Sequence, residues 1–158
     1  SVAPPNGSPL KSKVDIIISK GDNSGFLTEE VIEEIMLKKG YQMADGKYFT
    51  GGGNNGIDRI FYKGDLSDPD EILVFECKQL SPNGSATLNP ASQTTDLPIQ
   101  LSDDWLSYVA EKKLINMGGL KTETANAIRN TPPSQIQKYV VAINKTTGQI
   151  YFLKLGTF

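Results

Sequence analysis

The sequence predicts a mixed α/β fold in which a central β-sheet is flanked by helices. Residues 28–39 carry apolar side chains at the spacing of an amphipathic helix, the clearest helical signal in the chain. Residues 72–79 form an apolar run that suits a strand buried on both faces. Residues 138–155 contain two β-like runs around a polar turn, which is the pattern of a β-hairpin. Helix, strands, helices and strands therefore follow one another, as in a mixed sheet with helices packed on it.

The chain of 158 residues is expected to hold one packed domain. Residues 1–24 are predicted to be a linker and lead-in segment, rich in Pro, Ser and Gly at first and with a short β-like run at residues 14–19. Residues 25–158 are predicted to form the domain. No apolar run approaches the roughly 20 residues of a membrane-spanning helix, and the first residues lack the order of a signal peptide. We therefore expect no membrane-spanning segment and a start that resembles the cut edge of a larger protein.

The first predicted helix has end signals as well as an apolar stripe. Thr28 or Ser24 can cap its N-terminus, and Gly40 follows its last turn. At about 100° per residue, Glu29 lies closest to the edge of the apolar stripe. The other acidic residues of this helix point further outward: Glu30, Glu33 and Glu34. Glu29 is therefore the carboxylate of this helix that we single out.

The next segments are expected to supply the first strands of the sheet. Residues 41–50 are predicted to form a short strand or one arm of a hairpin. The glycine-rich residues 51–56 lack the Lys-Ser/Thr pair of a P-loop. We interpret them as a flexible approach, a segment whose backbone can come close to a large molecule. Residues 57–62 alternate as a strand, with Asp58 on the face of Ile60.

The rest of the chain is predicted to contain the central strand, a long loop and two more helices. An acidic turn at residues 64–70 is expected to lead into the central strand, and residues 81–95 read as a long polar loop. Residues 101–115 are predicted to be a second helix, capped by Ser102. Residues 121–129 are predicted to be a third helix that ends before a proline pair, ahead of the closing hairpin.

The composition limits the chemistry that this chain can supply. It contains no histidine and one cysteine, Cys77. Histidine-dependent triads, a histidine general base and His-ligated zinc are therefore excluded within the chain, as are an internal disulfide and a cysteine-rich zinc site. Catalysis must use carboxylates, lysine, tyrosine or a metal held by oxygen ligands. The net charge of −2 argues against non-specific coating of nucleic acid, but not against a local basic groove.

Three charged residues around the central strand form the candidate site. Glu76 and Lys78 are two residues apart, so a strand sends their side chains to the same face. If residues 57–62 pair beside this strand, Asp58 approaches the same point. Two carboxylates and a lysine suit a hard divalent cation beside an anionic substrate. They also suit a structural charge cluster, because Glu-x-Lys pairs are common on strand surfaces.

These motifs resemble a known superfamily. Gly56-Ile57-Asp58, a hairpin and Glu76-Cys77-Lys78 are similar to the PD-(D/E)XK nuclease pattern, with Ile57 in place of the usual proline. Together with the segment Gln-Leu-Ser-Asp-Asp-Trp that begins at Gln100, they resemble the C-terminal toxin domains of contact-dependent growth inhibition (CdiA-CT) and Rhs effector proteins of bacteria. The resemblance covers roughly residues 25–115 and implies a restriction-endonuclease-like core.

The resemblance also implies a metal-dependent endonuclease. Asp58, Glu76 and the backbone carbonyl of Cys77 would bind Mg²⁺, with Mn²⁺ or Zn²⁺ as alternatives. Glu29 would hold the metal directly or through water, although Glu30 or Glu33 could take its place. Such a metal would activate a water molecule and stabilise charge on the scissile phosphate.

Further residues receive roles by the same resemblance. Lys78 would orient or activate the attacking water, or stabilise the charge that develops on phosphorus. Gln100 is a candidate auxiliary group, and Lys112 and Lys113 are candidates for contacting the nucleic-acid backbone. Trp105 and Cys77 are expected to pack in the core.

The resemblance finally implies a biological setting. It predicts a secreted or cell-surface-delivered effector domain that cuts DNA in the cytoplasm of a target bacterium and is neutralised by a cognate immunity protein. Residues 81–95 or the edge of the closing hairpin would contact that protein. Cleavage of RNA, above all tRNA, by the same fold stays open, as does a non-catalytic binding module.

Overall fold

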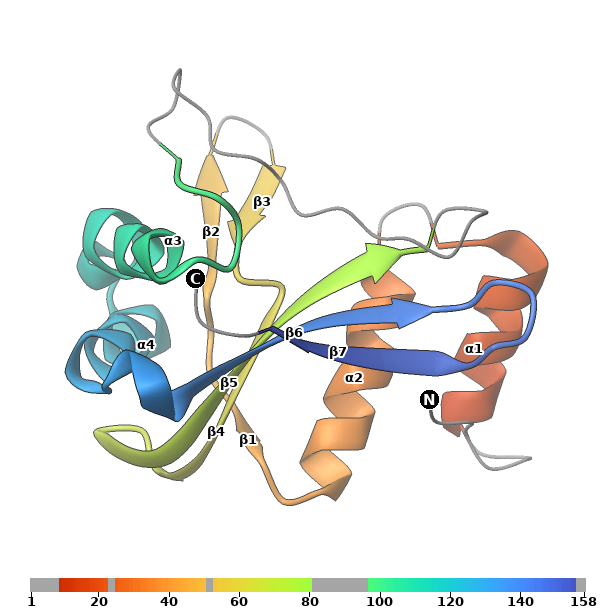
Figure 1. Ribbon diagram of the computed structural model, residues 1–158, viewed down its shortest axis with the longest axis horizontal. Helices are drawn as coiled ribbons and strands as arrows, with labels where there is room; N and C mark the ends of the chain where they lie inside the picture. The colour runs from red at the N-terminus through yellow and green to blue at the C-terminus, as the bar shows by residue number, and fades with distance from the viewer. Residues whose placement is uncertain (1–8, 23–24, 51–52, 81–96, 156–158) are drawn as a thin grey trace.

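The computed structural model describes residues 9–22, 25–50, 53–80 and 97–155. Its helices are α1 (Pro9–Lys20), α2 (Phe26–Lys38), α3 (Asp103–Tyr108), the π-helical turn η1 (Val109–Lys113), the 3₁₀ turn η2 (Leu114–Asn116), α4 (Gly119–Asn130) and the 3₁₀ turn η3 (Pro133–Gln135). Its strands are β1 (Gln42–Met43), β2 (Lys47–Thr50), β3 (Gly53–Gly56), β4 (Arg59–Asp65), β5 (Asp68–Gln79), β6 (Ile136–Ile143) and β7 (Ile150–Leu155). Figure 1 shows their arrangement.

Five strands form one mixed sheet in the order β1-β4-β5-β6-β7. Strands β5 and β6 run parallel, and the other neighbouring pairs run antiparallel. Strands β2 and β3 pair separately as a two-stranded hairpin that stands beside this sheet (Figure 1). The prediction of a mixed α/β fold with a central sheet flanked by helices is therefore confirmed, as is the closing hairpin.

Helices cover the two faces of the sheet and create a core on each side. Because side chains alternate along a strand, Ile72 and Val74 of β5 pack in the cluster that includes residues of α3 and α4. Leu73 and Phe75 pack in the other cluster, with residues of α1 and α2. Figure 1 shows these two helix pairs on either side of the strands. Burial of each such side chain contributes about 1.5–3 kcal/mol, so β5 stabilises the packing of both helical layers.

Helix α1 occupies a region where the sequence analysis predicted a linker and a short β-like run, and both predictions are wrong for residues 9–20. Leu10, Val14 and Ile17 lie at helical spacing and are buried in the cluster shared with α2. The β-branched run at residues 14–19 suggests a strand locally, but packing on α2 decides the outcome. Helix α1 is therefore part of the folded unit.

The N-terminus of α2 is capped differently from the prediction. The helix begins at Phe26, its N-cap residue Gly25 offers no side chain, and Ser24 lies outside the described residues. The buried carboxylate of Asp22 accepts hydrogen bonds from the backbone N–H of Leu27 at 3.2 Å and from that of Thr28 at 2.8 Å. The Thr28 hydroxyl donates to the same carboxylate. Asp22 therefore satisfies two of the four free N–H groups that a helix start leaves.

We expect Asp22→Ala to lower the free energy of unfolding by about 1–2 kcal/mol, because it removes a capping carboxylate. Urea unfolding followed by circular dichroism measures this change. Asp68→Ala is a suitable control, since Asp68 is an exposed aspartate at the start of β5. An Asp22 variant as stable as the control would contradict the capping role.

The remaining elements agree in part with the sequence. Ser102 caps α3 by accepting a hydrogen bond from the Trp105 N–H at 3.1 Å, as predicted, although the expected single helix is divided into α3, η1 and η2. Part of the glycine-rich segment interpreted as a flexible approach forms strand β3. The polar loop predicted at residues 81–95 lies outside the described residues. None of the helices in the described part of the chain has the length and apolar character needed to cross a membrane.

Candidate active site

Asp58 lies in a bend directly before β4, next to β5, rather than inside a strand as predicted. Its carboxylate oxygen Oδ2 accepts a hydrogen bond from the backbone N–H of Cys77 at 2.8 Å. This contact joins the start of β4 to the residue between Glu76 and Lys78. The predicted meeting of Asp58 with the end of the central strand is therefore seen in the structure.

The glycine before this bend is needed for the chain to reach it. Gly56 has a φ angle of 96°, and a Cβ atom at this position would lie 2.3 Å from the carbonyl oxygen of Gly46. The next residue, Ile57, is fully buried and donates its N–H to the same carbonyl at 2.9 Å. A side chain at position 56 would therefore both strain the backbone and displace the approach to Asp58.

Glu76 is the most unusual residue of the site. This residue is only 2% exposed, and it lies on β5 opposite Val140 of β6, one position beyond the last residue that pairs with β4. One oxygen, Oε2, accepts a hydrogen bond from the Gln100 side-chain amide at 2.7 Å. The other oxygen, Oε1, is buried and has no hydrogen-bond partner among the described residues. A buried acceptor without a partner costs about 1–3 kcal/mol, so this oxygen requires an explanation.

Gln100, whose side chain contacts Glu76, lies directly before a distorted position of the backbone. The following residue, Leu101, has a φ angle of 67°, the only positive φ among the described non-glycine residues. Leu101 is fully buried, and Ser102 then caps α3. Strain of this kind persists where surrounding contacts fix it, and it often accompanies functional sites. The structure therefore brings the predicted auxiliary residue into contact with a predicted catalytic carboxylate.

One cavity of about 320 Å³ gathers all six residues to which catalytic, metal-binding and auxiliary roles were given. These residues are Glu29, Asp58, Glu76, Cys77, Lys78 and Gln100. They come from α2, the bend before β4, the end of β5 and the segment before α3. Trp105 and Tyr48 also line the cavity, although both are largely buried, as expected of core residues.

The charges at this cavity influence one another. Burial raises the pKa of Glu76 well above its usual range, and the neighbouring Asp58 carboxylate raises it further, whereas Lys78 opposes both. Burial likewise raises the pKa of the Cys77 thiol, and nearby carboxylates add to the effect. The thiol therefore stays protonated at neutral pH, and Cys77 packs beside the core cluster of α1 and α2 as predicted.

Glu29 lies at the same cavity, but its carboxylate is already paired. Lys47 donates hydrogen bonds to both oxygens, at 2.7 and 2.9 Å, and Arg59 donates to one of them at 3.1 Å. Burial raises the pKa of Glu29, the Lys47 hydrogen bond opposes this shift, and the Asp58 charge adds to it. Lys47 and Arg59 were missed by the sequence analysis, and the only available signal was that Arg59 directly follows Asp58.

The donor set fits a magnesium-like ion with two protein carboxylates. Among the described residues, no three Asp, Glu or Cys side chains form a group that could hold a metal by themselves. Mg²⁺, however, is usually bound by one or two carboxylates together with water and substrate phosphate. Asp58 and Glu76 line the cavity with two carboxylates, and Glu76 Oε1, which lacks a hydrogen-bond partner among the described residues, is available to a ligand.

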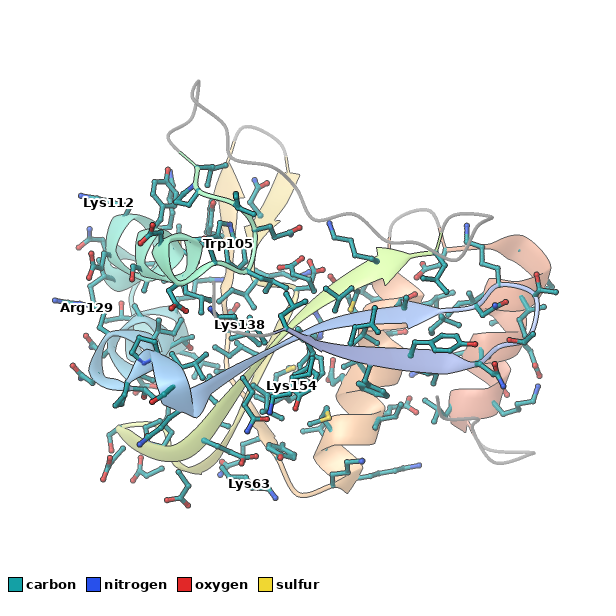
Figure 2. The ribbon with its side chains drawn as sticks, viewed as in Figure 1. Lys63, Trp105, Lys112, Arg129, Lys138 and Lys154 are labelled. Carbon is teal, nitrogen blue, oxygen red and sulfur yellow. The ribbon has the colours of Figure 1, made fainter. Side chains whose placement is uncertain are left out.

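The two lysines predicted to contact nucleic acid differ in position. Lys112 is exposed and lies at the outer edge of the helical layer in Figure 2, well away from the labelled Trp105. Lys113 turns inward, with its ammonium 5.5 Å from the ring centre of Tyr48 and 5.9 Å from that of Tyr108. Because Tyr48 lines the cavity, Lys113 is the better placed of the two.

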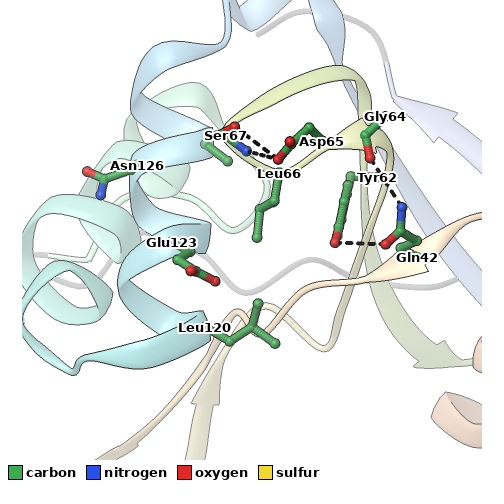
Figure 3. A pocket seen from close by; sticks show the side chains of 10 residues that line it. Gln42, Tyr62, Gly64, Asp65, Leu66, Ser67, Leu120, Glu123 and Asn126 are labelled. Atoms are coloured by element: carbon green, nitrogen blue, oxygen red, sulfur yellow. Dashed lines mark hydrogen bonds between the residues drawn. The ribbon is translucent and has the colours of Figure 1, made fainter.

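A second and larger cavity, of about 580 Å³, lies between the β4–β5 turn and α4 (Figure 3). It contains none of the predicted site residues. Several of its polar groups pair with one another: the Tyr62 hydroxyl donates to Gln42, Gln42 donates to the Gly64 carbonyl, and Ser67 donates to Asp65. No buried, unpaired polar atom points into it from the described residues.

Comparison of the chain with protein-family models, with curated proteins and with solved structures finds no match. The interpretation of the site therefore depends on its residues and their geometry.

Proposed function

We propose that this protein is a metal-dependent endonuclease that hydrolyses phosphodiester bonds in DNA. The observation that carries the proposal is the buried Glu76 carboxylate, with one oxygen unpartnered, beside Asp58 and Lys78 in a single cavity. A purely structural charge cluster has no need for a buried carboxylate that is left half satisfied. A site that accepts a cation and an anionic substrate has that need.

Each residue then has a chemical task. Asp58, Glu76 and the Cys77 carbonyl would hold Mg²⁺, which lowers the pKa of a bound water and offsets charge on the phosphate. Gln100 and the Cys77 N–H keep the two carboxylates in place. Lys78 lines the cavity, and no hydrogen bond or ion pair within the described residues engages its ammonium group. It can therefore stabilise the negative charge that builds on the phosphate oxygens.

Hydrolysis at this site would be a displacement at phosphorus, with water as the nucleophile and a sugar oxygen as the leaving group. The oxygen of water bonds to phosphorus, the bond between phosphorus and a sugar oxygen breaks, and that sugar oxygen takes up a proton. The water gives up one proton as it attacks. Lys78 stabilises the intermediate charge without being consumed, and the carboxylates of Asp58 and Glu76 return unchanged.

The proposed setting follows from the sequence resemblance. We infer that the domain acts as a toxin in a target bacterium and that a cognate immunity protein neutralises it. The same site could hydrolyse RNA, because it addresses the phosphodiester group that both polymers share. A toxin that cuts tRNA is therefore the alternative that the test must separate.

Supercoiled plasmid and total tRNA, incubated side by side with Mg²⁺, Mn²⁺, Zn²⁺ or EDTA, provide the test. We expect metal-dependent nicking of the plasmid that is lost in Asp58→Ala and in Lys78→Ala. Lys154→Ala serves as the matched control, because it removes an exposed lysine from β7. Cleavage of tRNA alone would keep the site but change the substrate. Full activity in both site variants, or no cleavage by the wild type, would overturn the nuclease proposal.

A further inference from the structure

We infer that Glu29 is a positioning residue that acts through Arg59 and Lys47, and that it is not a ligand of the metal. This inference rests on the proposed function, since it assigns roles around the same site. We call Glu29, Lys47 and Arg59 the Glu29 ion-pair network. It joins three elements, because Glu29 belongs to α2, Lys47 to β2 and Arg59 to β4.

The network is largely withdrawn from solvent. The side chains of Glu29 and Arg59 are 11% and 14% exposed, and that of Lys47 is 23% exposed. Lys47 bonds both Glu29 oxygens, and Arg59 adds a third hydrogen bond through Nη1. Hydrogen bonds between charged groups in such surroundings are short and strong, so this arrangement is well defined.

Arg59 connects the network to the catalytic aspartate. The same Nη1 group that contacts Glu29 donates to the backbone carbonyl of Asp58 at 2.9 Å. Its Nε lies 3.4 Å from a carboxylate oxygen of Glu33, one turn further along α2. Asp58 is thus held at two points, by Arg59 at its carbonyl and by the Cys77 N–H at its carboxylate. Helix α2 fixes the orientation of Asp58 through Arg59.

Direct metal binding by Glu29 is incompatible with this arrangement. Magnesium binds carboxylate oxygens at about 2.0–2.1 Å. A divalent cation at that distance would share the Glu29 carboxylate with the ammonium of Lys47 and the guanidinium of Arg59. Three cationic groups on one carboxylate repel one another strongly in a partly buried site. The network would have to break before Glu29 could bind the ion, and Asp58 would then lose its support.

The two roles predict different results for a double-mutant cycle built from Glu29→Gln and Arg59→Met. Single-turnover cleavage of the plasmid measures the chemical step at saturating Mn²⁺. The loss of the free-ion electron paramagnetic resonance signal measures Mn²⁺ binding without any reaction. We expect each single variant to slow cleavage about 10–100-fold, the usual effect of removing a supporting residue. Because both changes release Asp58 from the same support, we expect the two single variants to alter the Mn²⁺ dissociation constant equally, to within about threefold of each other.

The double variant should be about as slow as either single variant, because both changes break the same connection. Arg59→Lys should restore part of the rate, since it keeps the charge but loses the second donor. Glu34→Gln is the matched control: it breaks the ion pair between α2 and Lys13 of α1 and leaves the network intact, so its cleavage rate should equal that of the wild type.

A loss of Mn²⁺ affinity in Glu29→Gln that is at least tenfold greater than the loss in Arg59→Met would overturn the inference and make Glu29 a ligand. Multiplicative effects in the double variant, or an unchanged rate in both single variants, would also overturn it while leaving the nuclease proposal intact. Absence of any cleavage by the wild type would overturn both. Urea unfolding of each variant shows whether a lost rate follows from a lost fold, and the Arg59→Lys variant keeps the test decisive if Arg59→Met does not fold.

Discussion

Glu76→Gln is expected to make the metal-free protein more stable and, at the same time, to remove the nuclease activity that we propose for it. The Glu76 carboxylate is buried, one of its oxygens is unpartnered, and Asp58 lies beside it. Glutamine has nearly the same shape but carries no charge, and its amide can donate to the Asp58 carboxylate. We expect the free energy of unfolding near pH 8 to rise by about 1–3 kcal/mol, the cost of an unsatisfied buried acceptor.

The stability gained by Glu76→Gln should increase as the pH rises. Burial and the Asp58 charge raise the pKa of Glu76 in the folded state above its value in the unfolded chain. At a pH below the unfolded value of about 4.3, Glu76 is protonated in both states and affects stability little. As the pH rises, the unfolded chain releases this proton first, so the wild type loses stability. The difference between Glu76→Gln and the wild type should therefore be small at pH 4 and large at pH 8.

Urea unfolding in EDTA at both pH values measures this difference, and cleavage of plasmid measures the activity. Activity should fall by about 10²–10³-fold or more, as when a charge-stabilising group is removed from an active site. Glu123→Gln is the matched control, because Glu123 is an exposed glutamate on α4. A Glu76→Gln variant less stable than the wild type at pH 8 would mean that the carboxylate is satisfied and has a structural role.

The features that the sequence predicted correctly depend on local regularities. Glu76 and Lys78 share a face of β5 because side chains alternate along any strand, whatever surrounds it. Asp58 reaches them because a hairpin returns the chain to the same end of the sheet, as the pairing of Arg59 with Phe75 shows. Ser102 caps α3 because the capping interaction is complete within four residues.

The features that the sequence did not predict depend on contacts between distant segments. The run of β-branched residues at 14–19 looks like a strand until helix α2 is available to bury one side of it. Lys47 and Arg59 lie 18 and 30 residues from Glu29, and no periodic pattern links them to it. A motif therefore indicated which residues meet at the cavity, whereas only the tertiary structure shows which of them are already paired.

Asp58→Asn and Asp58→Ala should separate the two tasks proposed for Asp58. Its carboxylate accepts the hydrogen bond from the Cys77 N–H at 2.8 Å, and in the proposed site it would also supply charge for the metal. Asparagine keeps an oxygen that can accept this bond but removes the charge, whereas alanine removes both. We expect both variants to lose cleavage activity by about 10²–10³-fold.

Stability should distinguish the variants. Both changes end the repulsion between Asp58 and Glu76, but Asp58→Ala also leaves the Cys77 N–H without its partner, so its free energy of unfolding should be about 1 kcal/mol lower than that of Asp58→Asn. Asp58→Asn keeps the bond and ends the repulsion between two carboxylates, so it should be at least as stable as the wild type in EDTA. Plasmid cleavage, Mn²⁺ binding and urea unfolding measure the three properties. An Asp58→Asn variant that keeps its Mn²⁺ affinity and cleaves at the wild-type rate would show that the charge of Asp58 has no catalytic role, and the metal site would then have to lie elsewhere.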